Sequence, residues 1–316
     1  MVSFRCRLMA GVVAMVRRVL LISGVLASAA IAGDNRLIDD SGYTLVLNKP
    51  AQRVISLAPH LTEQVFSAGA GDRLIATVNY SDYPEAALAL PRVGTYKKVN
   101  YELISELKPD LILAFGGNGM EMVNRLRALG FKVYMDEPQS LEDVALLLED
   151  LGLLLGAEEQ AKAAAADFRQ RYQALQHQYQ QQEVVRVFYQ VWNQPLLTIN
   201  GQHLISRVIQ LCGGENIFAD AIPMAPKISV ETVIRRNPEA IVASGHGDAR
   251  PEWLDEWQQW TVIEAVQKKQ LFFIPPDILQ RHTTRILDGA EMMCEYLQQV
   301  RYNKTERHGV REKLSE

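Results

Sequence analysis

The stretch Ala157–Gln182, AEEQAKAAAADFRQRYQALQHQYQQQ, predicts one long helix near the middle of the 316-residue chain. Its apolar residues recur at helical spacing, and neither glycine nor proline interrupts it. Most of the other residues are Ala, Gln, Glu, Lys and Arg, which all favour helix. About 24 helical residues would span roughly 36 Å, longer than most globular helices. We interpret this helix as a rigid connector between two lobes; a long amphipathic helix on the surface of one domain is the alternative.

The segments on either side of this helix repeat one pattern. Glu102–Ala114 (ELISELKPDLILA) and Glu231–Ala243 (ETVIRRNPEAIVA) both begin with Glu, carry Pro seven residues later and end in an apolar strand. Duplicated α/β lobes with parallel sheets would place a ligand cleft between them, at the ends of their strands. The sequence therefore predicts an α/β fold of two parallel-sheet lobes joined by one long backbone helix.

Local signals predict the further elements. Ser140 with Asp143 predicts a capping box for a helix that ends at Gly156. A hairpin is expected over Arg36–Leu47, since Asp40-Ser41-Gly42 supplies a turn. Apolar periodicity predicts further helices at Thr62–Ala68, Tyr101–Leu107, Val230–Arg236, Trp253–Ala265 and Thr284–Val300.

The chain divides into five expected parts. Residues 1–32 are a secretory signal peptide, 33–139 an N-terminal α/β lobe, 140–182 a helical connector and 183–302 a C-terminal α/β lobe. Residues 303–316 are charged and lack apolar periodicity, so we expect a disordered tail there.

The predicted signal peptide shows the usual order of a basic segment, an apolar run and a cleavage site. Arginines precede an apolar run that ends in Ala30-Ile31-Ala32, so cleavage is expected near Ala32. The apolar run is too short to span a membrane. These features predict a soluble protein exported to the periplasm. The net charge of -4 and the pI near 5.9 give no sign of a nucleic-acid partner.

The cysteines and histidines limit which disulfides and metal sites the chain can form. Removal of the signal peptide leaves Cys212 and Cys294, which in an oxidising compartment suggest one disulfide; two buried free thiols are the alternative. No pair of histidines has metal-ligand spacing. His60 and His282 each follow a strand and could face a cleft, although solvent exposure or a hydrogen bond is the favoured role for both. We expect Gly116–Gly119 to line the cleft rather than to bind phosphate. Nothing in the sequence resembles a complete catalytic constellation.

The order and spacing of several motifs resemble the substrate-binding proteins of iron-chelate and cobalamin ABC importers. The resemblance covers about residues 40–300. Three motifs are similar to the cobalamin-binding branch, and a fourth marks the entry to the fold: Tyr80–Pro84, Glu102 with Lys108–Asp110, Cys212–Phe218, and Asp40–Gly42 with Pro50–Pro59. The resemblance implies two α/β lobes joined by a backbone helix, with little hinge motion. It also implies that cobalamin lies between the lobes as a transported ligand, not as a cofactor.

Carried over by position, the resemblance implies ligand contacts by Tyr80, Tyr96, Asp277 and Arg281. Aromatic faces would pack against a large planar macrocycle, while Asp and Arg would bind its amide rim. A packed loop aromatic is the alternative for Tyr80, and a local surface ion pair is the alternative for Asp277 with Arg281. Some members of the family carry Trp where this chain has Tyr96 and Ala225, which leaves the identity of the corrinoid open.

The resemblance also implies a membrane partner. Glu102 and Glu231 match two docking glutamates, one per lobe, that pair with arginines on a permease; helix-start carboxylates favoured by the helix dipole are the alternative. Cys212 and Cys294 align with a cysteine pair of the family. We therefore expect a monomeric, non-enzymatic periplasmic protein that delivers cobalamin or a related corrinoid to an ABC importer. The rivals are a haem or ferric-siderophore carrier on the same scaffold and an exported small-molecule enzyme.

Overall fold

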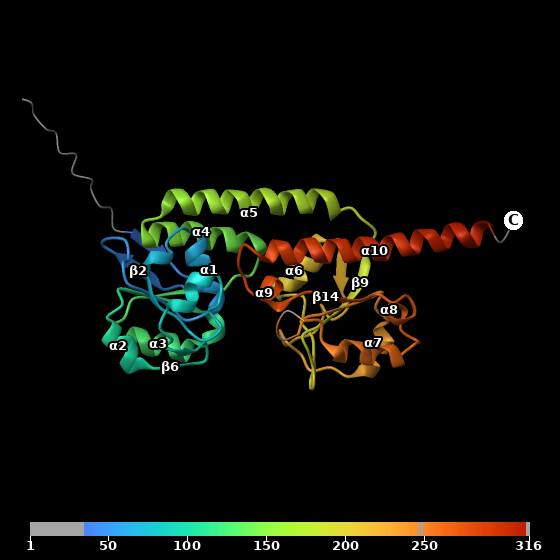
Figure 1. Ribbon diagram of the computed structural model, residues 1–316, viewed down its shortest axis with the longest axis horizontal. Coiled ribbons are helices and arrows are strands. Elements are labelled where there is room, and N and C mark those ends of the chain that lie inside the picture. The colour runs from blue at the N-terminus through green and yellow to red at the C-terminus, as the bar shows by residue number, and fades with distance from the viewer. Residues whose placement is uncertain (1–34, 246, 248, 314–316) are drawn as a thin grey trace, which may run out of the picture. The chain divides into compact units, whose positions relative to one another are not determined.

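Two four-stranded parallel sheets form the frame of the protein (Figure 1). The structure, a computed structural model, describes residues 35–245, 247 and 249–313, so the predicted signal peptide lies outside the described residues. The first sheet has the order β4-β3-β7-β8 and contains β3 (Val54–Ser56), β4 (Leu74–Ala76), β7 (Leu111–Phe115) and β8 (Val133–Asp136). The second has the order β12-β9-β13-β14 and contains β9 (Val185–Gln190), β12 (Gly214–Asn216), β13 (Ala240–Ala243) and β14 (Leu271–Phe273). The predicted fold class is confirmed.

Helices cover both faces of each sheet. They are α1 (Pro59–Ser67), α2 (Tyr101–Leu107), α3 (Met120–Ala128), α4 (Leu141–Leu155), α5 (Glu158–Tyr179), α6 (Leu204–Leu211), α7 (Val230–Arg236), α8 (Glu264–Gln267), α9 (Pro276–Leu279) and α10 (Ile286–Lys313). Three small antiparallel hairpins complete the described part, formed by β1 (Asn35–Ile38) with β2 (Thr44–Leu47), β5 (Gly94–Thr95) with β6 (Lys98–Val99), and β10 (Trp192–Asn193) with β11 (Leu196–Leu197).

The central strands β7 and β13 are apolar throughout because both of their faces are buried, as is usual for parallel sheets. In β7, Leu111 and Leu113 face one core cluster while Ile112 and Ala114 face another. Alternation of side chains between the two faces of a strand produces this division. In β13, Ala240 and Val242 belong to the same first cluster as Leu111, while Ile241 and Ala243 belong to a third.

The long helix α5 connects the lobes, as predicted, and its 22 residues end within three residues of the predicted limits. It lies along α4 and α10 (Figure 1). Its buried residues Ala161, Ala165, Phe168 and Leu175 belong to the one core cluster that contains strand residues of both sheets. The hydrophobic core therefore continues beneath α4 and α5 from one lobe into the other.

The N-terminal ends of two helices follow local sequence chemistry. Ser140 accepts from the amide of Asp143, and the Asp143 carboxylate accepts from the amide of Ser140, which confirms the capping box of α4. The helix α1 begins at Pro59 rather than at Thr62 as predicted. Proline suits the first turn of a helix, where its missing N–H needs no partner. As a result, His60 lies on α1 rather than in a loop.

The helix predicted over Trp253–Ala265 is wrong. The chain forms a 3₁₀ segment over Glu252–Gln259 and then the short helix α8. The apolar residues Leu254, Trp257, Trp260 and Ile263 are spaced three apart, which matches the 3.0 residues per turn of a 3₁₀ helix. This spacing is visible in the sequence and favours a 3₁₀ helix over an α-helix.

The disordered tail predicted over residues 303–316 is also wrong for its described part, because α10 continues to Lys313 instead of ending at Val300. Lys304 lies 2.9 Å from Glu183 and 2.5 Å from Glu239, with its side chain only 13% exposed. Two carboxylates from the C-terminal lobe thus fix the helix beyond its predicted end.

Candidate functional site

The loops that follow the strands carry the candidate ligand-binding residues. Tyr80 follows β4, Tyr96 lies in the turn between β5 and β6, and Asp277 lies on α9, after β14. Carboxyl ends of parallel strands are the usual ligand-binding edge of an open α/β sheet. The structure therefore places candidates on this edge in both lobes.

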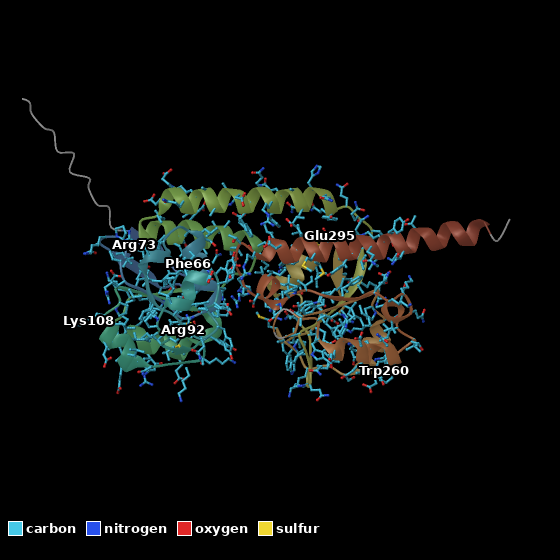
Figure 2. The ribbon with its side chains drawn as sticks, viewed as in Figure 1. Phe66, Arg73, Arg92, Lys108, Trp260 and Glu295 are labelled. Carbon is cyan, nitrogen blue, oxygen red and sulfur yellow. A yellow bond between two sulfur atoms is a disulfide. The ribbon has the colours of Figure 1, made fainter. Side chains whose placement is uncertain are left out.

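Tyr80 is held with its side chain exposed. Its φ of 65° is unusual for a residue other than glycine, and 76% of its surface is accessible. The next residue, Ser81, is buried, and its hydroxyl accepts from Thr77 at 2.7 Å. Arg92, labelled in Figure 2, donates to the carbonyl of Ser81 at 2.9 Å. A buried neighbour thus fixes a loop whose aromatic ring remains free for a partner.

Tyr96 is anchored separately and is 43% exposed. Asn118 donates to the backbone carbonyls of Tyr96 and Leu57, and accepts from the amide of Phe115. The glycine loop that contains Asn118 was expected to line a cleft. A Cβ at Gly116 would lie 2.4 Å from the carboxyl carbon of Glu137, so a side chain at this position would have to displace the exposed Glu137 carboxylate.

Arg281 brings two of the candidate loops together. Its Nη2 lies 3.0 Å from Oδ1 of Asp277, in its own lobe, and 2.7 Å from Oδ1 of Asp82 in the loop that contains Tyr80. The Arg281 side chain is 12% exposed. The alternative of a purely local Asp277–Arg281 surface pair does not describe this geometry, because the guanidinium also joins the opposite lobe.

A buried carboxylate that the sequence reading missed lies behind Arg281. Glu63 on α1 is 1% exposed and accepts from Thr283 at 2.6 Å and twice from Arg285 at 2.7 Å. Nη1 of Arg281 is 3.9 Å from Glu63 Oε2. The sequence gives no direct signal for it, because the burial of the run His60–Val65 appears only in the structure, where this carboxylate is paired as a buried one requires.

Three histidines from both lobes meet beside this network. The ring centroids of His60 and His282 are 5.4 Å apart, those of His203 and His282 are 6.4 Å apart, and Phe115 packs against His60 and His282. Nε2 of His60 and Nδ1 of His282 are buried without hydrogen-bond partners among the described residues. The expectation that both histidines are solvent-exposed or hydrogen-bonded is wrong for these atoms.

Burial sets the charge state of this histidine cluster. It lowers the pKa of His282 to about 4 and that of His203 to about 4, because the charged form loses its hydration. The pKa of His60 is lowered well below its usual value by burial first, and then by His282 and Arg281. All three rings are therefore neutral at pH 7.

The two candidate docking glutamates lie at equivalent places. Glu102 and Glu231 are both exposed and both occupy the second position of a seven-residue helix, α2 and α7 respectively. Asn100 and Ser229 cap these helices with their side chains. A hydrogen bond with Ser229 lowers the pKa of Glu231. The internal repeat of the sequence is thus a repeat of local structure, with one exposed carboxylate on each lobe.

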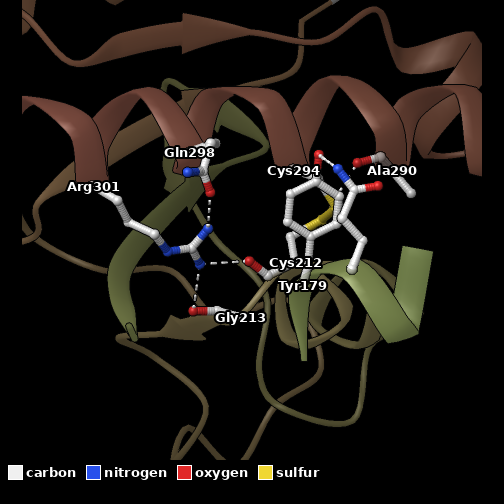
Figure 3. The surroundings of a disulfide bond; sticks show 8 residues. Tyr179, Cys212, Gly213, Ala290, Cys294, Gln298 and Arg301 are labelled. Carbon is white, nitrogen blue, oxygen red and sulfur yellow. Dashed lines mark hydrogen bonds between the residues drawn. A yellow bond between two sulfur atoms is a disulfide. The ribbon is translucent and has the colours of Figure 1, made fainter. Parts of the chain in front are cut away.

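The disulfide lies inside the C-terminal lobe. Cys212 and Cys294 are bonded with an S–S distance of 2.05 Å, joining the end of α6 to α10, and both residues are fully buried (Figure 3). Arg301 on α10 donates to the backbone carbonyls of Cys212 and Gly213 at 2.7 and 3.1 Å. The alternative of two free thiols is excluded in this structure.

The described residues contain neither a metal-binding cluster nor a helix that could cross a membrane. Within residues 35–245 and 249–313, no three His, Cys, Asp or Glu side chains are arranged to hold a metal ion. None of the helices in the described part is both long and apolar enough to cross a membrane.

Comparison with known proteins identifies the fold as a familiar one. A family model described as periplasmic binding protein matches residues 54–278. The Vitamin B12-binding protein of Vibrio cholerae is 42% identical over 249 residues, covering 78% of this chain and 90% of that protein. The crystal structure of the periplasmic vitamin B12 binding protein BtuF of Vibrio cholerae has a TM-score of 0.74 at 40% identity and covers 80% of this chain and 98% of that one.

A more distant structure shares the fold alone. The apo periplasmic heme-binding protein RhuT from Roseiflexus sp. RS-1 has a TM-score of 0.68 at 19% identity, covering 79% of this chain and 99% of that one. The family model matches more than half of the chain, and the relative from Vibrio cholerae is alike over nearly its whole length. This chain therefore belongs to the periplasmic binding protein family.

Proposed function

We propose that this chain captures cobalamin or a related corrinoid in the periplasm and delivers it to the permease of an ABC importer. The observation that carries the proposal is the Arg281–Asp82 ion pair, which unites the loop of Tyr80 with the segment of Asp277 and Arg281 from the other lobe. It occurs in a chain 42% identical to a protein named for vitamin B12 binding. We assign no catalytic role to the site.

The chemistry of these side chains suits a corrinoid. The exposed rings of Tyr80 and Tyr96 offer apolar faces to a planar macrocycle. The macrocycle carries amide groups at its rim. Arg281 can donate to the amide carbonyls, and Asp277 can accept from the amide nitrogens. On this proposal the ligand binds between the lobes, and Arg281 exchanges part of its ion pairing for hydrogen bonds to the ligand.

Docking to the permease is assigned to Glu102 and Glu231. Both carboxylates are exposed, and their equivalent positions suit a partner with two-fold symmetry. Arginines on the permease would pair with them and fix the register of the complex. Their favourable position at a helix start is compatible with this role.

Haem is the rival ligand, because one buried ring nitrogen each of His60 and His282 has no hydrogen-bond partner among the described residues and imidazole can ligate iron. Both rings are packed against Phe115, so ligation would require the cluster to open. The corrinoid proposal needs no such opening. For that reason we favour it.

Calorimetric titration of the mature protein with cobalamin, cobinamide, haem and a ferric siderophore tests the proposal. We expect a corrinoid to bind with a Kd in the micromolar range or tighter, about -8 kcal/mol or better. Tyr80→Ala should weaken this binding, whereas Leu129→Ala, an exposed apolar residue after α3, should not. Tight binding of haem with no binding of either corrinoid would contradict the proposal.

A further inference from the structure

Glu63 is the most buried charged group at the junction of the lobes. Its side chain is 1% exposed, and its two oxygens accept from the hydroxyl of Thr283 and from Nε and Nη2 of Arg285. The acceptor lies on α1, which packs in the N-terminal lobe, and the donors are 220 and 222 residues further along the chain. A buried carboxylate without these donors would be strongly unfavourable, so α1 and the segment from Thr283 to Arg285 are held together.

The same segment also holds the loop that contains Tyr80. The guanidinium carbon of Arg285 lies 3.7 Å from the ring centroid of Tyr83, and Nη2 of Arg281 lies 2.7 Å from Asp82. Two consecutive residues of the loop thus contact two arginines of the other lobe. Both arginines face Glu63, one in direct hydrogen bonds and one at 3.9 Å.

The partners of Arg281 differ greatly in exposure. The side chains of Asp82 and Asp277 are 44% and 39% exposed, whereas that of Glu63 is 1% exposed. Water and salt screen an exposed ion pair, which then contributes little, while a buried charge is hardly screened. Glu63 therefore fixes Arg285 through hydrogen bonds and acts on Arg281 as a poorly screened buried charge at 3.9 Å, while the two exposed aspartates make the shorter contacts with Arg281.

We infer that Glu63 is a positioning residue for ligand binding, which sets Arg281 and the Tyr80 loop in their binding arrangement across the two lobes. It does not touch the ligand itself. The inference rests on the proposed function for its ligand, but the contacts on which it depends are independent of that ligand. Burying charges to join two lobes costs desolvation free energy, and positioning of the ligand-binding residues would give this ion network a function.

A double-mutant cycle measures this role. The Kd for cobalamin is determined for the wild type, Glu63→Gln, Arg281→Gln and the double variant. If Glu63 acts through Arg281, Glu63→Gln should weaken binding about tenfold in the wild type and less than about twofold in the Arg281→Gln background. Equal losses in both backgrounds would mean a general structural role and would overturn the inference.

A matched control separates positioning from stability. Asp39 is another buried carboxylate paired with an arginine, Arg127, but it lies at the β1–β2 hairpin. Asp39→Asn should lower the unfolding midpoint in urea and leave the Kd for cobalamin within about twofold. If Asp39→Asn weakens binding as much as Glu63→Gln does, any loss of stability suffices and the inference fails.

Hydrogen exchange measured without ligand tests the inference even if the chain binds no corrinoid. It also allows a second variant to be used if Glu63→Gln folds poorly. The amides of Thr283, Ile286 and Asp288 are hydrogen-bonded within the segment that Glu63 holds. They should exchange at least about fivefold faster in Glu63→Gln, or in Thr283→Val, which removes only one donor and is the variant to use if Glu63→Gln does not fold. Unchanged exchange in a folded variant would overturn the inference. A wild type that binds no corrinoid would refute the proposed function alone.

Discussion

Acidification should destabilise this protein through the histidine cluster at the lobe junction. His282 packs against His60, His203 and Phe115, and Gln64 donates to its backbone carbonyl at 3.4 Å. The nearby charged groups are Arg281 and the Glu63–Arg285 pair. Within the described part of the chain, a proton on Nδ1 of His282 would have no acceptor and would lie among other bases. The perturbation is therefore a fall in pH from about 7.5 to about 5, at which carboxylates of ordinary pKa remain ionised.

The sign follows from the pKa in the two states. Burial lowers the pKa of His282 from 6.5 to about 4, so the unfolded chain binds more protons between these values. Stability therefore rises with pH across this window, is complete above about 6.5 and is lost as the pH falls toward 4. At a pH of about 5 the linkage relation gives a loss of about 2 kcal/mol for His282 alone. His203, whose pKa is also about 4, adds a similar amount.

The buried carboxyl of Asp136 and the partly buried carboxyl of Asp150 act in the opposite direction. Burial raises the pKa of Asp136 well above its usual value and raises that of Asp150, so both groups favour the folded state more as the pH falls. The total pH dependence of the wild type is therefore smaller than the contribution of the histidines. Comparison with a histidine variant removes the carboxyl contribution, since it is common to both proteins.

The assay is urea denaturation of the wild type, His282→Gln and His177→Gln at both pH values. His177 is exposed on α5 and serves as the matched control. The loss of unfolding free energy between pH about 7.5 and about 5 should be about 2 kcal/mol smaller in His282→Gln than in the wild type and unchanged in His177→Gln. Equal losses in all three proteins would refute the assignment of the pH dependence to the buried cluster.

Two further predictions concern the disulfide and the proposed docking pair. Replacement of Cys212 and Cys294 by serine opens a loop with a sequence separation of 82, and the chain-entropy model gives a loss of about 4–5 kcal/mol in urea denaturation; an unchanged midpoint would contradict it. Glu102→Arg combined with Glu231→Arg should abolish docking to permease in vesicles by like-charge repulsion while the Kd for cobalamin stays within about threefold. Docking that survives the double change, or ligand binding that is lost with it, would show that these glutamates are not a dedicated docking pair.

Local chemistry made much of the fold predictable. The helices α2 and α7 have the predicted bounds because each has a polar N-cap and a proline two residues beyond its last residue. The helix α5 was predictable because a long run of helix formers has no breaker. By contrast, β12 (Gly214–Asn216) was missed. A Gly-Glu-Asn segment has low strand propensity, and only pairing with β9 makes it a strand.

The candidate site was harder to predict, because its geometry depends on contacts between distant segments. Glu63 and Arg285 are separated by 222 positions, and no periodic pattern connects them. The resemblance to a family implies ligand contacts by Tyr80 and Arg281 and says nothing of the carboxylate behind them. The sequence carries no local signal for this carboxylate, because the burial of the helical run around Glu63 appears only in the folded structure.

The internal repeat is not limited to the two similar sequence segments, because side-chain contacts around them are repeated as well. Arg53 donates to carbonyls at the end of α2, and Arg186 does the same at the end of α7. The backbone amide of Arg53 donates to Asp110, and that of Arg186 donates to Glu239.

The frame of helix and strand beneath Glu102 and Glu231 is thus built twice with the same contacts. The ligand-side loops are not repeated in this way: Tyr80 follows β4 at the edge of one sheet, while Asp277 precedes the two arginines in the other lobe. On the proposed function, this symmetric frame would suit a permease of two-fold symmetry. Asymmetric loops meet a different requirement, because an aromatic face from one lobe and charged groups from the other can recognise different parts of one ligand. Selection on docking and selection on cargo can therefore act on separate residues of the same duplicated fold.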